Sequence, residues 1–308
     1  GRFSLTAPAA GTYRLRSERI GFRAGLSDLF ELSAQENHTL DMLVDPVVVR
    51  LDTLTVSGDS RRCRVVGEQG LQTATVWEEA RKALTSVAWG ESGQVFTYEI
   101  KYFNRYFEQN GRLDHEQSTT IRRARVMPFT NPDANQLYER GYAIERGEVE
   151  DSSEYFAPDA SVFFSDAFLQ HHCFKLERDD DLEGLVGLAF EPTRGRDVPD
   201  VKGTLWLNEE TAELRRMELR YTDLRSHLRR RNARAEVEFA RLENGMWFVQ
   251  SWLIHMPIVR IVRPRVGGAT RRSEELWGFK EEGSQVLRVL GRGREVLFEA
   301  ARDTTEQH

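Results

Sequence analysis

The stretch FTYEIKYFNRYFEQNGRL, residues 96–113, decides the fold class. Apolar and polar residues alternate along its first half, with Phe96, Tyr98, Ile100 and Tyr102 on one face, which is the period of a half-buried β-strand. Asn110-Gly111 is a strong signal for a tight hairpin turn. The stretch therefore predicts a strand, a turn, and a return strand from about residue 113 to 126.

The same pattern recurs along the rest of the chain. Asn244-Gly245 predicts a second hairpin, between strands at 235–242 and 246–256. Further alternating segments lie at 184–190, 201–207, 213–221, 273–280 and 285–290, and an apolar stretch at 162–169 predicts a short helix. We expect a mainly β protein with a large, curved antiparallel sheet and one or two helices.

One long helix is predicted over residues 74–88. Its apolar residues are spaced as on one face of a helix, namely Val76, Ala80, Ala83, Leu84 and Val87. Thr75 and Glu78 have the spacing of a capping box, with Thr73 as the alternative cap, and Gly90 is expected to stop the helix.

The domain organisation follows from these elements. Residues 1–56 contain only short strand patterns and predict a small antiparallel sandwich. Residues 57–93 form a connector that includes the helix, residues 94–295 form the curved sheet, and residues 296–308 form a polar tail.

Composition excludes several classes of protein. The chain has 308 residues, 40% hydrophobic and 30% charged, with no apolar run of the length of a transmembrane helix, no collagen repeat and no heptad array. It also lacks the motifs of nucleotide-binding and serine-hydrolase sites and the spacing of a zinc site. We therefore expect no enzyme activity, no catalytic or metal-binding residues and no cofactor.

The most reactive cluster is His171-His172-Cys173. Neighbouring side chains of a strand point to opposite faces, so the two histidines cannot easily bind one metal. A hydrolase using one of them would need a third, orienting group. Asp179-Asp180-Asp181 lacks the spacing of a calcium loop and is interpreted as a charged turn.

Positive charge is concentrated in one band. Residues 222–272 hold 11 Arg and 4 acidic residues, in a chain whose net charge is −6. Such a band favours an anionic partner or lipid headgroups; the alternative is a solvated strand face balanced by nearby carboxylates. An acidic chain without a recognisable binding fold argues against nucleic acid. The predicted contact residues are Arg229, Arg230, Arg231, Arg260, Arg263 and Arg265.

Aromatic residues are spread through the β-rich part, including Trp206, Trp247, Trp252 and Trp277. On a curved sheet they either fill a core or line a cavity for a lipid or acyl chain. The two cysteines, Cys63 and Cys173, would close a loop of roughly 110 residues if bonded, stabilising by about 4–5 kcal/mol in an oxidising compartment. Two buried reduced thiols are the alternative.

Residues 1–56 resemble a known module. The segments GRFSL at 1–5, GTYRL at 11–15 and IGF at 20–22 resemble the second half of the carboxypeptidase regulatory-like domain. This resemblance implies a transthyretin-like β-sandwich in an exported bacterial protein, whose first strands would lie upstream of Gly1. The module is an accessory one and implies no peptidase activity.

Later segments resemble the connector and β-rich region of exported bacterial proteins that carry this module. They include LDTLTV at 51–56, VWEEARKAL at 76–84, HCF at 172–174 and GTLWL at 203–207. Both cysteines fall inside matched segments, Cys63 in Arg62-Cys63 and Cys173 in the segment 172–174, so the resemblance implies a Cys63–Cys173 disulfide and a periplasmic location. One known use of such a protein is as an extrinsic subunit of a photosynthetic reaction-centre and light-harvesting complex.

Together these observations predict a non-catalytic periplasmic protein, peripheral to the membrane, that docks on a membrane protein complex and stabilises it. The alternative is a carrier of lipid or lipoprotein with an apolar cavity in the curved sheet.

Overall fold

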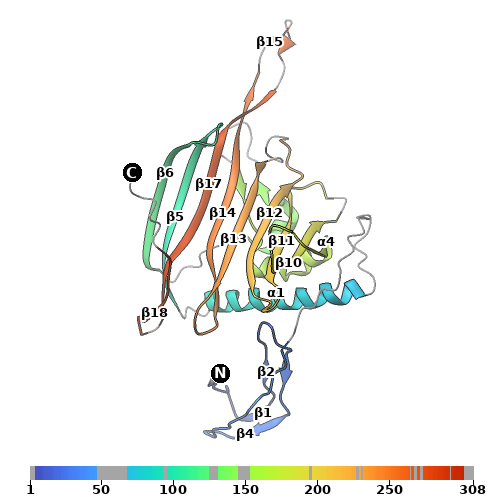
Figure 1. Ribbon diagram of the computed structural model, residues 1–308, viewed down its shortest axis with the longest axis vertical. Helices are drawn as coiled ribbons and strands as arrows, with labels where there is room; N and C mark the ends of the chain where they lie inside the picture. The colour runs from blue at the N-terminus through green and yellow to red at the C-terminus, as the bar shows by residue number, and fades with distance from the viewer. Residues whose placement is uncertain are drawn as a thin grey trace.

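The computed structural model describes residues 4–46, 68–92, 96–124, 131–144, 153–193, 196–226, 229, 232–263, 265–266, 269–270, 273–291 and 293–301. These residues form a mainly β protein built on one large, twisted antiparallel sheet (Figure 1). The predicted fold class is confirmed.

The large sheet has ten strands in the order β6-β5-β17-β14-β13-β12-β11-β10-β9, with β18 paired to β17. Their bounds are β5 Thr97–Glu108, β6 Leu113–Ala124, β9 His172–Glu177, β10 Leu185–Pro192, β11 Asp200–Asn208, β12 Leu214–Thr222, β13 Arg234–Arg241, β14 Trp247–Val262, β17 Ser273–Leu290 and β18 Val296–Glu299. β18 lies in the segment that the sequence pattern assigns to a polar tail.

Both predicted hairpins are present. The Gly111 N–H donates to the Glu108 carbonyl at 2.9 Å, and the Gly245 N–H donates to the Leu242 carbonyl at 2.8 Å. Both glycines have positive φ, +85° and +89°, which a side-chain-bearing residue adopts only with strain. The turn residues therefore set where the strands reverse.

β17 is one continuous strand where the sequence pattern predicts two. It lies between β5 and β14, which are neighbours of it in the sheet but distant in the chain. Its insertion joins the β5–β6 hairpin to the meander that runs from β9 to β14. Without β17 the two parts would be separate sheets.

The predicted helix is confirmed in its centre but is longer than expected. α1 runs over Glu68–Ser92, so Thr75 lies inside the helix rather than at its start, and the helix continues through Gly90. The apolar stretch at 162–169 forms two short helices, α3 Ala160–Phe163 and α4 Asp166–His171, because Asp159 and Ser165 each cap a new start. A further helix, α2 Ala134–Arg140, was not predicted.

α1 crosses one face of the sheet near one end of the strands (Figure 1). Its apolar face packs with α3, α4 and the inward side chains of β9 to β14 in a single core. Among the fully buried members of this core are Phe163, Phe168, Phe190, Leu188, Leu205 and Leu214. The inner face of the sheet is thus filled by side chains and helices.

A second, smaller core lies where β5, β14, β17 and β18 meet. It contains Phe96, Tyr98, Ile100, Leu242, Phe248, Val286 and Val289, with Leu297 and Phe298 packed against it. Outside the large sheet, β7 Ala143–Ile144 pairs with β8 Glu154–Tyr155, and β15 Arg265–Val266 pairs with β16 Ala269–Thr270.

The N-terminal region, residues 4–46, is organised differently. It holds two two-stranded sheets, β1 Gly11–Tyr13 with β4 Phe30–Leu32 and β2 Arg16–Ser17 with β3 Gly25–Leu26. None of its described side chains is buried, and Leu5, Leu26, Leu29 and Leu43 are exposed. The predicted sandwich is not confirmed, and residues 47–56 of it lie outside the described residues.

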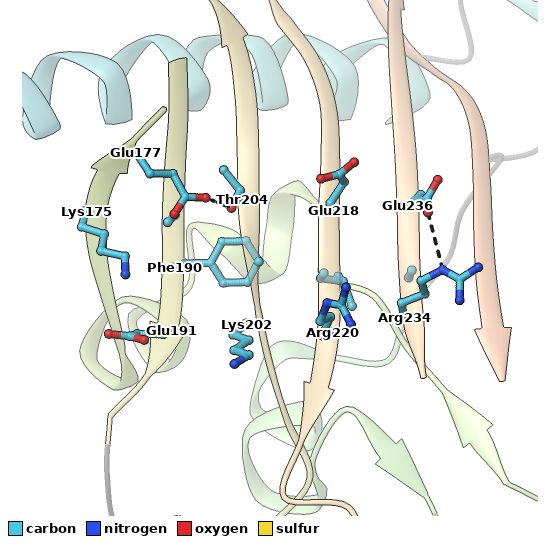
Figure 2. A pocket seen from close by; sticks show the side chains of 14 residues that line it. Lys175, Glu177, Phe190, Glu191, Lys202, Thr204, Glu218, Arg220, Arg234 and Glu236 are labelled. Atoms are coloured by element: carbon cyan, nitrogen blue, oxygen red, sulfur yellow. Dashed lines mark hydrogen bonds and ion pairs between the residues drawn. The ribbon is translucent and has the colours of Figure 1, made fainter. Parts of the chain in front are cut away.

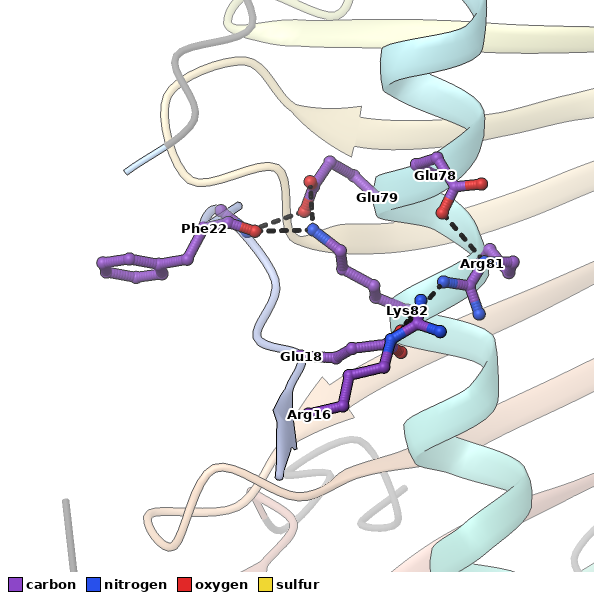
Figure 3. Close-up of polar contacts among 8 residues, drawn as sticks. Arg16, Glu18, Phe22, Glu78, Glu79, Arg81 and Lys82 are labelled. Carbon is purple, nitrogen blue, oxygen red and sulfur yellow. Dashed lines mark hydrogen bonds and ion pairs between the residues drawn. The ribbon is translucent and has the colours of Figure 1, made fainter. Parts of the chain in front are cut away.

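This region attaches to α1 through a short loop (Figure 3). The Gly21 N–H donates to Glu79 Oε2 at 2.7 Å, and Lys82 Nζ donates to the Phe22 carbonyl at 2.6 Å. Glu79 and Lys82 also form a buried ion pair with each other at 2.7 Å. Ile20 packs against the main core next to this pair.

Candidate interaction surface

The β14–β17 hairpin projects beyond the rest of the sheet as a two-stranded arm, which we define as residues 259–277 (Figure 1). β13 stops pairing with β14 at His255, and β5 stops pairing with β17 at Gly278. Beyond these points Val259–Val262 pairs only with Ser273–Leu276, and β15 and β16 lie at the tip. The arm points away from the end of the sheet where α1 lies.

The arm carries five of the eleven arginines of the basic band. Arg260 lies on β14, Arg263 directly follows β14 and Arg265 begins β15, while Glu274 and Glu275 lie on the return strand. The Arg263 side chain is exposed. The arm is therefore a projecting element rich in arginine.

Arg260 combines its charge with an aromatic ring. Its guanidinium carbon lies 3.3 Å from the centroid of the Trp277 ring, a cation–π contact across the two strands, and Glu275 is its register partner. Trp277 is still 55% exposed. An exposed tryptophan beside arginines is a typical contact residue, both in protein interfaces and at membrane surfaces.

A second basic segment, the loop between β12 and β13, is tied to the root of the arm. Ser226 Oγ donates to Glu274 Oε2 at 2.8 Å, and the Arg229 N–H donates to Ser226 Oγ at 3.3 Å. Arg229 and Arg260 are 31 positions apart in the sequence. The Ser226–Glu274 bond nevertheless holds the segment that contains Arg229 beside the arm. The structure thus gathers the separated parts of the basic band at one end of the sheet.

The predicted contact residues can be placed only in part. Arg229, Arg260 and Arg263 lie on the loop and the arm as described, and Arg265 begins β15. Arg230 and Arg231 lie outside the described residues. Sequence reasoning found the charge, and it named Trp277 only as an aromatic residue that fills a core or lines a cavity. It missed the exposure of Trp277 and the Ser226–Glu274 bond, because neither stands out from its local pattern.

The two histidines occupy different environments. His171 ends α4 and stacks on Tyr138, with ring centroids 4.4 Å apart. His172 opens β9, is buried, and stacks on Phe168 at 3.8 Å. Its Nδ1 lies 3.1 Å from the Phe168 carbonyl and its Nε2 lies 3.2 Å from Asp200 Oδ1. Because the ring is sealed in the core, His172 fits a structural role better than a catalytic one.

Asp200 is the centre of a buried polar cluster that sequence reasoning missed. Besides facing His172, it accepts the Val201 N–H at 2.8 Å and pairs with Arg196 Nε at 3.0 Å. Burial raises the pKa of nearby Tyr142 well above its ordinary value, and the charge of Asp200 raises that pKa further. Arg196 also donates to the Tyr138 carbonyl at 2.6 Å, so the cluster joins α2 to the edge of the sheet.

The remaining predicted residues are placed as follows. Cys173 lies in β9 and Cys63 lies outside the described residues, so their pairing stays a prediction. Asp179-Asp180-Asp181 forms the predicted turn, in which the Asp181 N–H donates to Asp179 Oδ1 at 3.0 Å. Within the described ranges no cluster of His, Cys, Asp and Glu side chains is arranged to hold a metal ion.

No protein-family model, no curated protein and no solved structure matches this chain. Of the helices in the described part of the chain, none has the length and hydropathy needed to cross a membrane.

Proposed function

We propose that this protein is a non-catalytic periplasmic interaction protein that docks on an anionic surface of a membrane protein complex and stabilises the complex. The observation that carries the proposal is the basic arm, residues 259–277, which projects beyond the sheet with Arg260, Arg263 and the exposed Trp277 on it. The family resemblance adds the periplasmic location and makes a photosynthetic reaction-centre complex the specific candidate.

The arm suits docking for two physical reasons. Among the described side chains of the arm only Val259 is buried, so this ribbon gains little stability from a core, and burial does not explain the arginines and the exposed tryptophan on it. Basic residues on a projecting element also raise the rate at which a protein meets an acidic partner.

The carrier alternative receives less support from the inner face of the sheet. A carrier needs an unfilled apolar cavity, whereas Val76, Leu84, Phe163 and Phe168 from the helices pack against the strands on the face that α1 covers. We therefore prefer the interaction role.

The test is co-isolation from native membranes in mild detergent, followed by mass spectrometry of the bound proteins. The full chain is expected to recover a fixed set of membrane subunits. The variant Arg260→Gln/Arg263→Gln/Arg265→Gln is expected to lose at least about ten-fold in recovery, because it removes three charges from the arm.

A matched control is available at the α1 end of the sheet. Arg178, Arg215 and Arg241 have side chains between 46% and 50% exposed and lie away from the arm. Their triple glutamine variant removes the same charge and should leave recovery unchanged. Equal loss in the two variants, or recovery of the full chain as a free monomer, would contradict the proposal.

A further inference from the structure

The outer face of the sheet, which points away from α1, carries a hollow of about 480 Å³ over β9 to β13 (Figure 2). Inward residues such as Leu176, Leu205 and Leu219 belong to the core, so the residues that alternate with them face outward. On β10 the outward residue is Ala189, which is small and buried, and the longer side chains of β9 and β11 stand around it.

Positive side chains cross this hollow from strand to strand. Lys202 on β11 is directly opposite Arg220 on β12, which is directly opposite Arg234 on β13. Neighbouring strands are about 4.8 Å apart, so three cations stand in one short row. Lys175 on β9, the register partner of Ala189, adds a fourth (Figure 2).

Three of the four carboxylates that line the hollow have partners. Glu218 binds Arg216 at 2.9 Å and the Trp206 indole N–H at 3.2 Å, while Glu177 accepts the Thr204 hydroxyl. Glu236 lies 3.7 Å from Arg234. These contacts give the three carboxylates their partners. None of them involves Lys202 or Arg220.

Three cations are left without such a partner. Within the part of the chain that the structure describes, no carboxylate lies within 4.0 Å of Lys175, Lys202 or Arg220. Like charges directly opposite each other on neighbouring strands destabilise a sheet. The row therefore has an unfavourable electrostatic energy that a bound anion would relieve.

We propose that this hollow binds a hydroxylated phosphate monoester, with the phosphate against Lys202 and Arg220 and the organic part over Ala189. A phosphate dianion carries one negative charge for each of Lys202 and Arg220, and the guanidinium of Arg220 can donate two parallel hydrogen bonds to it. Glu191, on β10 between the strands that carry Lys175 and Lys202 (Figure 2), has no cation within 4.0 Å among the described residues. Its carboxylate can accept hydrogen bonds from hydroxyl groups of the organic part.

This site is separate from the docking arm, since it uses β9 to β13 on the face of the sheet and none of residues 259–277. The phosphate monoester of glycerol occurs in a free metabolite, whose hydroxyl groups can donate to Glu191, and in the headgroup of phosphatidic acid, whose glycerol hydroxyls are esterified and cannot. Both sources are tested below.

The small number of lysines makes binding directly measurable. The chain has five, Lys82, Lys101, Lys175, Lys202 and Lys280, so reductive methylation with ¹³C-formaldehyde gives few NMR signals, which Lys→Arg variants assign. Titration with glycerol 3-phosphate at constant ionic strength should shift the Lys175 and Lys202 signals with one saturable curve. Lys101, which pairs with Glu116 at 3.1 Å, should not follow it.

Two arginines of one strand give a matched pair of variants. Arg220→Gln is expected to weaken glycerol 3-phosphate binding at least about ten-fold. Arg216→Gln, on the same strand and face but paired with Glu218, should change it less than about two-fold. Glu191→Gln should remove any preference for glycerol 3-phosphate over inorganic phosphate.

Flotation with vesicles of phosphatidylcholine, with and without phosphatidic acid, distinguishes the two sources. Binding to phosphatidic acid that Arg220→Gln abolishes would identify a lipid headgroup, and binding of the soluble ester alone would identify a free metabolite. The proposal is overturned if neither probe binds, if all lysine signals move together, or if Arg216→Gln weakens binding as much as Arg220→Gln.

Discussion

The N-terminal region and the large sheet are both β-rich, yet only the sheet has a core. Residues 4–46 form strands of two or three residues, each with one partner, and bury none of their described side chains. In the sheet, inner strands such as β11 and β12 have partners on both sides and one face against helices. Strand pattern alone does not make a core; a second layer against one face does.

The largest expected effect tests that contrast directly. Phe163→Ala should lower the free energy of unfolding by about 3–5 kcal/mol, because the ring is fully buried and packs edge-on against Phe168 and Phe190. Leu43→Ala, at a side chain that is 99% exposed, should change it by less than about 0.5 kcal/mol. Urea denaturation measures both. Similar losses for the two variants would show that Leu43 is covered in solution.

The next effect concerns the joint between the two regions. Glu79→Gln should cost about 3 kcal/mol, because it leaves the buried Lys82 ammonium without a counter-charge. Proteases should also cleave residues 4–46 faster, since the Gly21 and Phe22 contacts depend on this pair. Limited proteolysis and urea denaturation report the two changes.

The neighbouring Glu78 is a matched control. It pairs with Arg81 at 2.9 Å but is 54% exposed, so Glu78→Gln should cost less than about 1 kcal/mol. If Glu79→Gln behaves like Glu78→Gln, the buried pair does not hold the two regions together.

High pH should destabilise the sheet through its buried tyrosines. Burial raises the pKa of Tyr142 and of Tyr221, so both stay protonated when folded at a pH where the unfolded chain ionises. Their contribution is complete below about pH 10, the ordinary tyrosine value, and is lost above it, by up to about 1.4 kcal/mol per pH unit for each tyrosine.

The measurement is the difference in unfolding free energy between pH 9 and pH 11. Tyr142→Phe should make that difference smaller, whereas Tyr138→Phe, at a side chain that is 36% exposed, should leave it unchanged. If Tyr142→Phe leaves the difference in unfolding free energy between pH 9 and pH 11 unchanged, the Tyr142 phenol ionises in the folded protein as easily as in the unfolded chain.

The smallest expected effect probes how closely the N-terminal region approaches the sheet. Gly21 has φ +76°, and a Cβ there would lie 3.0 Å from the Thr211 carbonyl oxygen in the β11–β12 turn. Gly21→Ala should cost about 1–2 kcal/mol, from backbone strain and this close contact. At Gly111, φ +85° with open space, alanine should cost only about 1 kcal/mol. Equal losses in thermal or urea unfolding would place Thr211 farther from Gly21.

Part of the candidate surface could be predicted from the sequence. The excess of arginine between residues 222 and 272 is a property of composition, and it marks the arm and the β12–β13 loop. The exposure of Trp277 could not be predicted, because an outward position on a strand looks the same whether or not a neighbouring strand continues beside it. The row of Lys202, Arg220 and Arg234 depends on register between three strands, which residue patterns within one strand do not report.

The sequence by itself determined the class of the fold and its local elements. Alternation along residues 96–107, the two Asn-Gly turns and the apolar face of α1 are short-range patterns, and local sterics and side-chain direction are sufficient to read them. Tertiary structure alone decided that β17 separates β5 from β14, that His172 faces Asp200, and that Ser226 ties its loop to the arm. These pairings join residues far apart in the chain, and they are selected by the packing and register of the whole sheet.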